Sequence, residues 1–252
     1  MSVTAPPQLC TESEIQSAYS GERMAASYVA NRFQSELNRL LHERQVHAVN
    51  RVMSEARPQH ALEIAPGPGR VTRDVRPAKH LTCLEFNEGM IEEGRRACRN
   101  GAEFVQGNAF ELPFESDQFD FAYTFRFIRH FHDDDRSRLY AQIASVLKPG
   151  GRLVFDAVNE RQSKPLRDAN PESYPVYDVL YREADLRSEL AAAGFLDIQL
   201  EVVQKRYRWQ YLSETLIAPR SQGLNRLIVR GLEALPARDG LEWIVTCRRS
   251  AH

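Results

Sequence analysis

The chain has 252 residues, of which 42% are hydrophobic and 27% charged, so it is long enough for one α/β domain with additions. Its formal net charge of −1 argues against a dedicated nucleic-acid-binding protein, because such proteins usually carry a basic excess. No apolar run reaches membrane-spanning length, and the first residues lack the basic and apolar parts of a signal peptide. The four cysteines form no Cys-x-x-Cys pair, so we expect neither a metal site nor disulfides, and we expect a cytoplasmic location.

Two helical segments are predicted before the first strand. After a tail that contains prolines, residues 12–33 have a helical pattern that is interrupted near Ser20 and Gly21. Residues 35–57 carry apolar side chains at helical spacing, and Pro58 ends this second helix.

The middle of the chain alternates between strands and helices. We expect strands at 60–65, 80–85, 102–107, 119–125 and 152–158. Between them we expect helices near 69–76, 88–99 and 133–147, and Asn87 is a suitable N-cap for the second of these. Strands that are separated by helices indicate a parallel, doubly wound sheet.

The alternation breaks after Asn159. Residues 159–182 are polar and rich in Pro, Tyr and Arg, and we interpret them as an insertion or lid. We then expect, in chain order, a helix over 183–193, a strand over 195–211, a helix over 221–235 and a last strand over 241–247. The third of these is amphipathic, because one face collects Leu224, Leu227, Ile228, Leu232 and Leu235.

A turn rich in proline and glycine follows the first strand. Its sequence is Ala61-Leu62-Glu63-Ile64-Ala65-Pro66-Gly67-Pro68-Gly69-Arg70. Glycines let the backbone approach a ligand closely, and the start of a following helix offers free N–H groups. The stretch therefore predicts a strand–turn–helix of the nucleotide-binding kind, with a plain turn as the alternative.

Other strand ends carry polar residues at matching distances. Glu85 closes the second strand, where a carboxylate can accept hydrogen bonds from both hydroxyls of a ribose. Asn108-Ala109 follows the third strand, and Thr124-Phe125-Arg126 ends the fourth. The turn Lys148-Pro149-Gly150-Gly151 joins a helix end to the fifth strand.

This series resembles the class I S-adenosylmethionine-dependent methyltransferases, especially the ubiquinone- and menaquinone-biosynthesis type and its small-molecule relatives. The resemblance covers 61–157 closely and the flanks in outline. It implies an α/β fold with a doubly wound, Rossmann-like, seven-stranded, mostly parallel sheet whose last strand is antiparallel. It also implies an N-terminal tail and helical cover over 1–58, and a methyltransferase domain over 59–252 with insertions at about 159–182 and 210–238. One departure is Ala65, because the family usually has glycine there.

The resemblance further implies S-adenosylmethionine as cofactor and S-adenosylhomocysteine as product. It assigns cofactor binding to Tyr28, Glu63, Ala65, Pro66, Gly67, Gly69, Glu85, Phe86, Met90, Asn108, Ala109, Thr124 and Phe125. In this interpretation the turn holds the methionine end, Glu85 the ribose, and the residues after the second and third strands the adenine. Ordinary structural roles are the alternatives, such as packing for Tyr28 and Met90 and a turn for Asn108.

His130 and Arg126 are the candidate catalytic residues, because both follow the fourth strand, whose carboxyl end faces the ligand crevice. An imidazole there is able to accept a proton from a hydroxyl acceptor. A packed or surface histidine is the alternative for His130.

We expect in-line methyl transfer to a small molecule, with O- or N-methylation. The sequence lacks the motifs of nucleic-acid amino-methylating, cytosine C5 and protein-arginine enzymes, which favours a small acceptor. A protein or RNA acceptor, a non-catalytic cofactor-binding protein and a nicotinamide-dependent oxidoreductase are the alternatives. Aromatic residues within 159–182 and 207–235 suggest that these segments choose the acceptor, or else that they form a homodimer interface.

Overall fold

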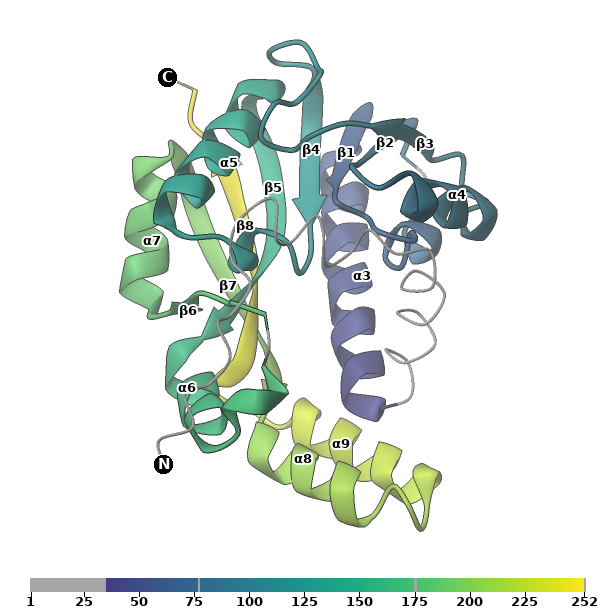
Figure 1. The fold of residues 1–252 in the computed structure, drawn as a ribbon, viewed down its shortest axis with the longest axis vertical. Coiled ribbons are helices and arrows are strands. Elements are labelled where there is room, and N and C mark those ends of the chain that lie inside the picture. Colours follow the sequence, from purple (N-terminus) through teal and green to yellow (C-terminus); the bar gives the residue numbers. More distant parts are fainter. Residues whose placement is uncertain (1–34, 77, 175, 252) are drawn as a thin grey trace.

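An eight-stranded sheet runs through the centre of the computed structural model, which describes residues 35–76, 78–174 and 176–251 (Figure 1). Seven strands follow one another in the order β3-β2-β1-β4-β5-β8-β7, and the short β6 pairs with β5 beside this path. The strands are β1 (His60–Ile64), β2 (His80–Glu85), β3 (Glu103–Gln106), β4 (Phe119–Thr124), β5 (Leu147–Asn159), β6 (Leu180–Tyr181), β7 (Phe195–Lys205) and β8 (Gly240–Arg249). The expected α/β fold is confirmed, with β6 as an additional short strand.

The carboxyl ends of the parallel strands meet at one edge of the sheet. β1 pairs in parallel with β2 and β4, while β2 pairs in parallel with β3 and β4 with β5. β8 runs antiparallel between β5 and β7, so the expected antiparallel last strand is also confirmed. β1 and β4 are neighbours without being consecutive, and ligands bind outside the carboxyl ends of strands at such a switch point.

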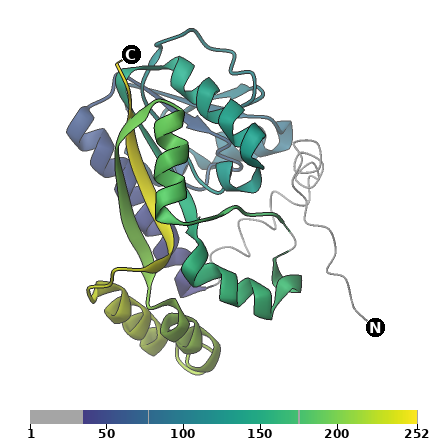
Figure 2. The same ribbon diagram turned by 90° about the vertical axis from the view of Figure 1, so that its left-hand side faces the viewer.

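Helices cover both faces of the sheet (Figure 2). On one face, α3 (Glu36–Ala56) and α4 (Glu88–Ala97) bury side chains in a cluster shared with the strands. On the other face, α5 (Asp133–Val146) and α7 (Glu183–Ala192) contribute to a second cluster. Because α3 shares a buried cluster with the strands, it forms part of the helical layer that packs against this face of the sheet. The helix predicted for 12–33 lies outside the described residues.

Local capping explains where two of these helices begin. The side chain of Ser35 accepts a hydrogen bond from the Asn38 N–H at the start of α3. The side chain of Asn87 accepts one from the Met90 N–H at the start of α4, as its position in the sequence predicted. No helix in the described ranges combines the length and the apolar character needed to cross a membrane.

The helix predicted for 69–76 is wrong. The chain forms only the single 3₁₀ turn η1 (Thr72–Asp74) there. Gly67 and Gly69 have φ angles of +58° and +72°, and Val75 is already extended, so few residues remain for a helix. The start of β5 was also misplaced, because this strand begins at Leu147 and not at residue 152.

The strand predicted for 195–211 is correct only up to Lys205. Arg206 adopts the left-handed conformation, with φ +53°, and ends β7. The helix α8 (Tyr207–Leu216) follows, in which Tyr207 and Tyr211 stack one helical turn apart with ring centroids at 5.9 Å. The alternation of aromatic residues at 207, 209 and 211 therefore imitated the period of a strand.

The segment 159–182 contains regular structure that its polar composition did not predict. It forms α6 (Glu160–Ala169), the 3₁₀ turn η3 (Pro171–Ser173) and β6. The side chain of Asn159 caps α6 by accepting a hydrogen bond from the Arg161 N–H. Pro165 lies inside this helix. A proline in a helix interior lacks a backbone N–H and normally disfavours a helix, so the sequence pattern did not predict one here.

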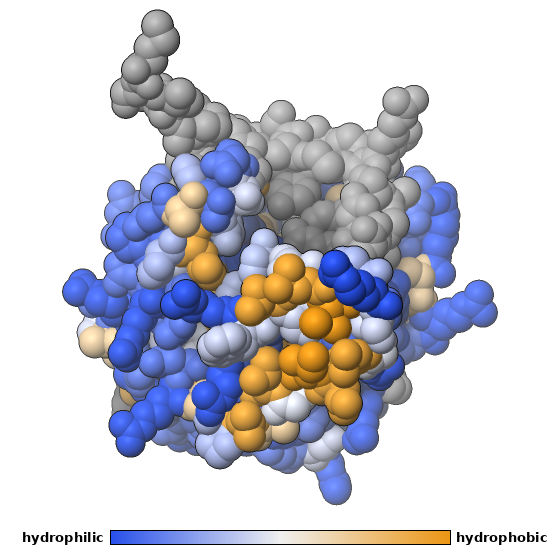
Figure 3. Space-filling model, turned by 90° about the horizontal axis from the view of Figure 1, so that it is seen from below, coloured by the Kyte–Doolittle hydropathy of each residue, from blue (hydrophilic) through white to orange (hydrophobic). Residues whose placement is uncertain are grey.

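The helix α9 (Gln222–Ala234) is present as predicted, but its apolar face points outward. Leu224, Leu227 and Leu235 are exposed, whereas Asn225 and Glu233 are buried. Figure 3 shows apolar side chains gathered on this lower face of the molecule, where α8 and α9 lie in Figure 1.

Candidate active site

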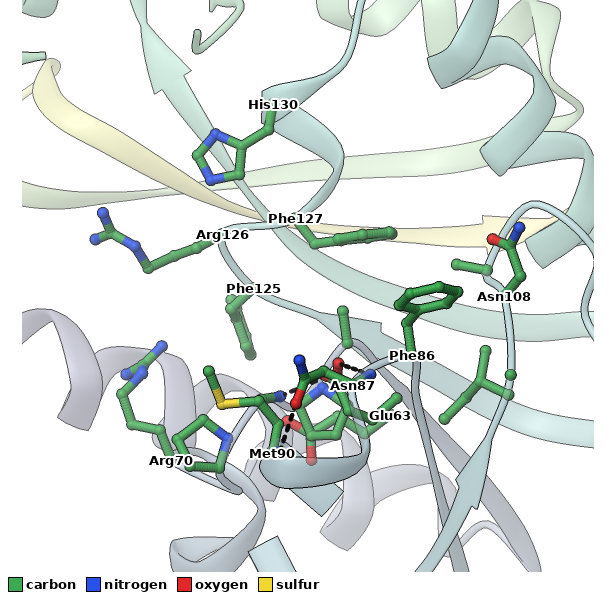
Figure 4. Close-up of a pocket in the computed structure, with 18 of the residues that line it drawn as sticks. Glu63, Arg70, Phe86, Asn87, Met90, Asn108, Phe125, Arg126, Phe127 and His130 are labelled. Atoms are coloured by element: carbon green, nitrogen blue, oxygen red, sulfur yellow. Dashed lines mark hydrogen bonds between the residues drawn. The ribbon is translucent and has the colours of Figure 1, made fainter. Parts of the chain in front are cut away.

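A pocket lies beyond the carboxyl ends of β1, β2 and β4 (Figure 4). Its volume is about 1120 Å³ when the open mouth is included. The structure brings together here most residues that the sequence singled out, namely Glu63, Ala65, Pro66, Gly67, Glu85, Phe86, Met90, Asn108, Ala109, Phe125, Arg126 and His130. Gly69 and Thr124 do not line it, and Tyr28 lies outside the described residues.

The turn after β1 is held in left-handed backbone conformations. Ala65 has φ +53°, which explains why glycine is the usual residue at this position of the resembled family. Gly67 points its N–H at the Glu85 carboxylate, 3.0 Å away, and its Cα faces open space. Gly69 has a packing role instead, since a Cβ there would lie 2.5 Å from the sulfur of Cys98.

Glu63 is a buried carboxyl group at the end of β1. Its Oε2 accepts hydrogen bonds from the hydroxyls of Thr72, at 2.6 Å, and Tyr123, at 2.8 Å. Burial raises the pKa of Glu63 to about 7, although these two hydrogen bonds act in the opposite direction. A positively charged ligand group in the pocket would favour the ionised form of this carboxyl.

Glu85 is anchored from both sides by the backbone. One carboxylate oxygen accepts from the Gly67 N–H and the other from the Asn87 N–H, each at 3.0 Å. Burial raises the pKa of Glu85, and these backbone hydrogen bonds oppose the shift. A carboxylate has about four acceptor positions, so Glu85 keeps acceptor capacity for a ligand hydroxyl.

The residues expected near an adenine line the neighbouring wall. Phe86 is 48% exposed and Met90 only 4%, so the methionine packs while the phenylalanine stands free at the pocket. Asn108 also has the turn role that was its alternative, because its Oδ1 accepts from the Phe110 N–H at 3.0 Å. Both roles are compatible, since the residue lines the pocket as well.

Thr124 ends β4 without reaching the pocket. Its side chain is buried, and its hydroxyl has no hydrogen-bond partner among the described residues. Phe125, the next residue, does line the pocket. Of these two expected cofactor-binding residues, only Phe125 lines the pocket.

Arg126 has a fixed backbone and an unpaired side chain. Its φ is +59°, and its N–H donates to Oδ1 of Asp156 at 2.6 Å. The guanidinium lines the pocket and has no acidic partner among the described residues, and its Nε is buried without a hydrogen bond. Such a group is suited to an anionic oxygen of a ligand.

His130 is held in one tautomer. Its Nδ1 lies 2.9 Å from the carbonyl oxygen of Tyr177. A carbonyl only accepts, so Nδ1 carries the hydrogen, and Nε2 of the neutral ring carries none. Within the described chain Nε2 has no hydrogen-bond partner, and the ring lines the pocket on the same side as Arg126 (Figure 4).

A buried charge cluster lies behind His130, and the sequence did not predict it. The guanidinium of Arg129 contacts carboxylate oxygens of Asp156 at 3.0 Å, Asp178 at 3.0 Å and Glu242 at 2.8 Å. Asp178 also lies 2.9 Å from Nδ1 of His130. Burial alone would raise the pKa of Asp178, but the surrounding positive charges hold it well below its usual range. These partners come from four segments far apart in the chain.

Sequence reasoning also missed Arg70 and several apolar wall residues. Arg70 directly follows Gly69, and it donates to the Gln45 side chain at 2.7 Å while lining the pocket. The remaining wall is formed by Pro68, Val71, Leu84, Asn87, Gly107, Phe110, Phe127 and Phe131. The repeated phenylalanines from 125 to 131 were the available signal for an aromatic acceptor side.

Residues 61–151 match a family described as a methyltransferase domain. The ubiquinone/menaquinone biosynthesis C-methyltransferase UbiE of Brucella suis is 35% identical over 138 residues, which are 51% of this chain and 46% of that protein. Over these residues the chain is similar to class I S-adenosylmethionine-dependent methyltransferases. It spans about half the length of the curated relatives it matches.

Solved structures support the methyltransferase fold over nearly the whole chain. Magnesium protoporphyrin IX methyltransferase of Synechocystis, solved with S-adenosylhomocysteine, gives a TM-score of 0.64 at 12% identity, covering 95% of this chain and all of that one. The [4+2]-cyclase SpnF also gives 0.64, at 20% identity, covering 99% of this chain and all of that one. The second case shows that this fold alone does not determine a reaction.

The pocket of the methyltransferase domain fits S-adenosylmethionine, the cofactor of this class. Glu85 is oriented by two backbone hydrogen bonds and keeps acceptor capacity for ligand hydroxyls such as those of a ribose. A second carboxyl group, that of Glu63, lines the same pocket. Gly67 leaves open space where a side chain would narrow the pocket.

Proposed function

We propose that the protein transfers a methyl group from S-adenosylmethionine to a small-molecule acceptor. The observation that carries this proposal is one pocket that joins Glu63 and Glu85 to His130 and Arg126. The first pair suits the cofactor, and the second pair suits an acceptor that gives up a proton.

On the cofactor side, this chain's residues bind and shield. S-adenosylmethionine supplies an electrophilic methyl group on a sulfonium. Glu85 would accept from the ribose hydroxyls, and Glu63 would stabilise the positive charge of the methionine end. Phe125 and Met90 form apolar walls that exclude water from the transfer path.

On the acceptor side, His130 is the group able to take a proton. The hydrogen bond of Nδ1 to Tyr177 leaves Nε2 as an acceptor in the pocket. An acceptor hydroxyl would pass its proton to Nε2 as its oxygen attacks, with Arg126 beside the developing anion. We therefore favour O-methylation, whereas a neutral amine would need alignment alone.

Calorimetry with S-adenosylmethionine and S-adenosylhomocysteine is the first test. We expect both to bind, and we expect transfer of a labelled methyl group to members of a panel of phenols, carboxylic acids and amines. Failure to bind either compound would contradict the proposal. Binding without transfer to small molecules, proteins or RNA would identify a non-catalytic cofactor-binding protein.

The variant His130→Asn tests the base directly. The Asn side-chain N–H₂ can replace Nδ1 as donor to Tyr177, while the acceptor nitrogen Nε2 is lost. For a hydroxyl acceptor we expect kcat to fall roughly 10²–10⁴-fold with unchanged cofactor affinity. His132→Asn is the matched control, because His132 lies outside the pocket lining while its ring contacts that of Tyr177, with centroids 4.4 Å apart. Equal effects of the two variants would exclude a base role.

A further inference from the structure

The helical hairpin formed by α8 and α9 is packed with its polar side chains inside. Between the helices, the Ser213 hydroxyl donates to Asn225 at 2.8 Å, and the Gln210 amide donates to Glu233 at 3.0 Å. All four residues are at most 5% exposed. These hydrogen bonds join the two helices on their buried side, and most of the leucines of the hairpin lie on its outer side.

Those apolar side chains lie together on the outer face. Seven of the nine large hydrophobic residues that are exposed in the described chain lie on or directly after α8 and α9, namely Trp209, Tyr211, Leu212, Leu216, Leu224, Leu227 and Leu235. We call them the hairpin patch, and Figure 3 shows apolar side chains gathered on this face. Soluble monomers rarely leave such a patch open without a use for it.

The charge around the hairpin patch is one-sided. Between residues 206 and 238 the sequence has six arginines and only two acids, although the whole chain carries a net charge of −1. The two acids are Glu214 and Glu233. Each accepts a hydrogen bond within the hairpin, and neither is exposed. Arg208, Arg220 and Arg238 are exposed and have no acidic partner in the described residues.

We propose that the hairpin patch docks on an anionic lipid surface. Leucines with an exposed tryptophan and tyrosine enter the boundary between headgroups and acyl chains, and arginines at the rim pair with lipid phosphates. A second copy of this chain fits less well, because a two-fold contact would bring two arginine rims together. The hairpin follows β7, whose carboxyl end lies at the same sheet edge as the pocket, so docking turns the pocket side toward the lipid.

A single-tryptophan variant provides the test in the full chain. The protein has two tryptophans, and Trp243 is 5% exposed while Trp209 is 65% exposed. In Trp243→Phe, phosphatidylcholine vesicles with added phosphatidylglycerol should shift the Trp209 emission to shorter wavelength and reduce its quenching by iodide. Vesicles of phosphatidylcholine alone should have little effect.

Surface variants separate the apolar and the charged contributions. Leu224→Gln with Leu227→Gln should lower co-sedimentation with anionic vesicles tenfold or more. Arg220→Gln should lower it roughly fivefold, and raised salt should act in the same direction. Leu196→Gln is the matched control, because Leu196 on β7 is 49% exposed, like Leu224 at 48%, and should leave binding unchanged.

Three results would overturn the proposal. The first is equal binding to neutral and anionic vesicles. The second is no vesicle binding by a protein that light scattering shows to be a dimer and that Leu227→Gln makes monomeric, which would assign the hairpin patch to a second copy. The third is no vesicle binding by a monomer. Cofactor affinity is measured in parallel and is expected to stay unchanged, so failure of lipid docking and failure of methyl transfer are separate outcomes.

Discussion

The two sides of the pocket, which the proposed function assigns to the cofactor and to the acceptor, are built in different ways. On the cofactor side, Glu85 is bound by the backbone N–H groups of Gly67 and Asn87, which lie 18 and 2 positions away in the chain. On the acceptor side, Arg129 reaches Glu242 across 113 positions, and His130 reaches Tyr177 across 47. The cofactor side is thus assembled from neighbouring strand ends, whereas the acceptor side exists only when the segment after β5 and the last strand are both in place.

This difference predicts how substitutions behave. A change on the cofactor side should alter cofactor binding and leave the rest of the molecule folded. A change behind the acceptor side removes a contact between distant segments, so its cost should appear in global stability. Each variant below tests one side of this comparison.

The variant Arg129→Met should have the largest effect. It leaves the carboxylates of Asp156, Asp178 and Glu242 buried without their shared cation. Removal of one partner from a buried charge cluster typically costs about 3–5 kcal/mol of unfolding free energy. Urea denaturation at neutral pH would measure this loss.

An exposed arginine provides the control for that measurement. Arg96→Met removes ion pairs to Glu92 and Glu93 on the surface of α4, where each partner is more than one-third exposed. Such pairs are worth about 0–1 kcal/mol. Similar losses for Arg129→Met and Arg96→Met would contradict a structural role for the buried cluster.

The buried carboxyl of Glu63 should make stability depend on pH. Burial raises its pKa from the ordinary 4.5 to about 7, so between these values the folded protein holds a proton that the unfolded chain has released. The free energy of unfolding should therefore fall as the pH rises through this window, by about 3 kcal/mol in total. Urea denaturation from pH 4.5 to 8 in wild type and in Glu63→Gln would measure it, and the variant should lose this part of the slope.

The variant Glu85→Ala tests the cofactor side alone. Loss of two charge-assisted hydrogen bonds to the ribose, partly replaced by water, should weaken S-adenosylmethionine binding roughly 10–100-fold. Calorimetry would measure this, with Glu92→Ala on the exposed face of α4 as the control. Affinity like that of wild type in Glu85→Ala would remove the ribose assignment.

The same difference explains how far the sequence could be interpreted. The sheet, its strand-end acids and the Asn87 cap were predictable, because apolar period and turn chemistry are local signals. The cluster around Arg129 was not, because its partners lie between 27 and 113 positions away in the chain. Local signals also misled where tertiary structure overrides them, as in the helix α8, whose aromatic alternation imitates a strand, and in α9, whose leucines face outward.

The smallest expected effect concerns the turn after β1, where Ala65→Gly should stabilise the protein. Ala65 has φ +53°, a conformation that costs a residue with a Cβ about 1 kcal/mol or more and costs glycine little. The greater freedom of glycine in the unfolded chain offsets part of this gain, so we expect a net increase of roughly 0.5 kcal/mol. Ala141→Gly is the control, because Ala141 is exposed in the middle of α5 and the same change should cost roughly 0.5–1 kcal/mol there. Changes of opposite sign in the unfolding free energy of the two variants would show that the Ala65 side chain strains the turn. Equal losses of unfolding free energy would show that Ala65 adopts its left-handed conformation without strain.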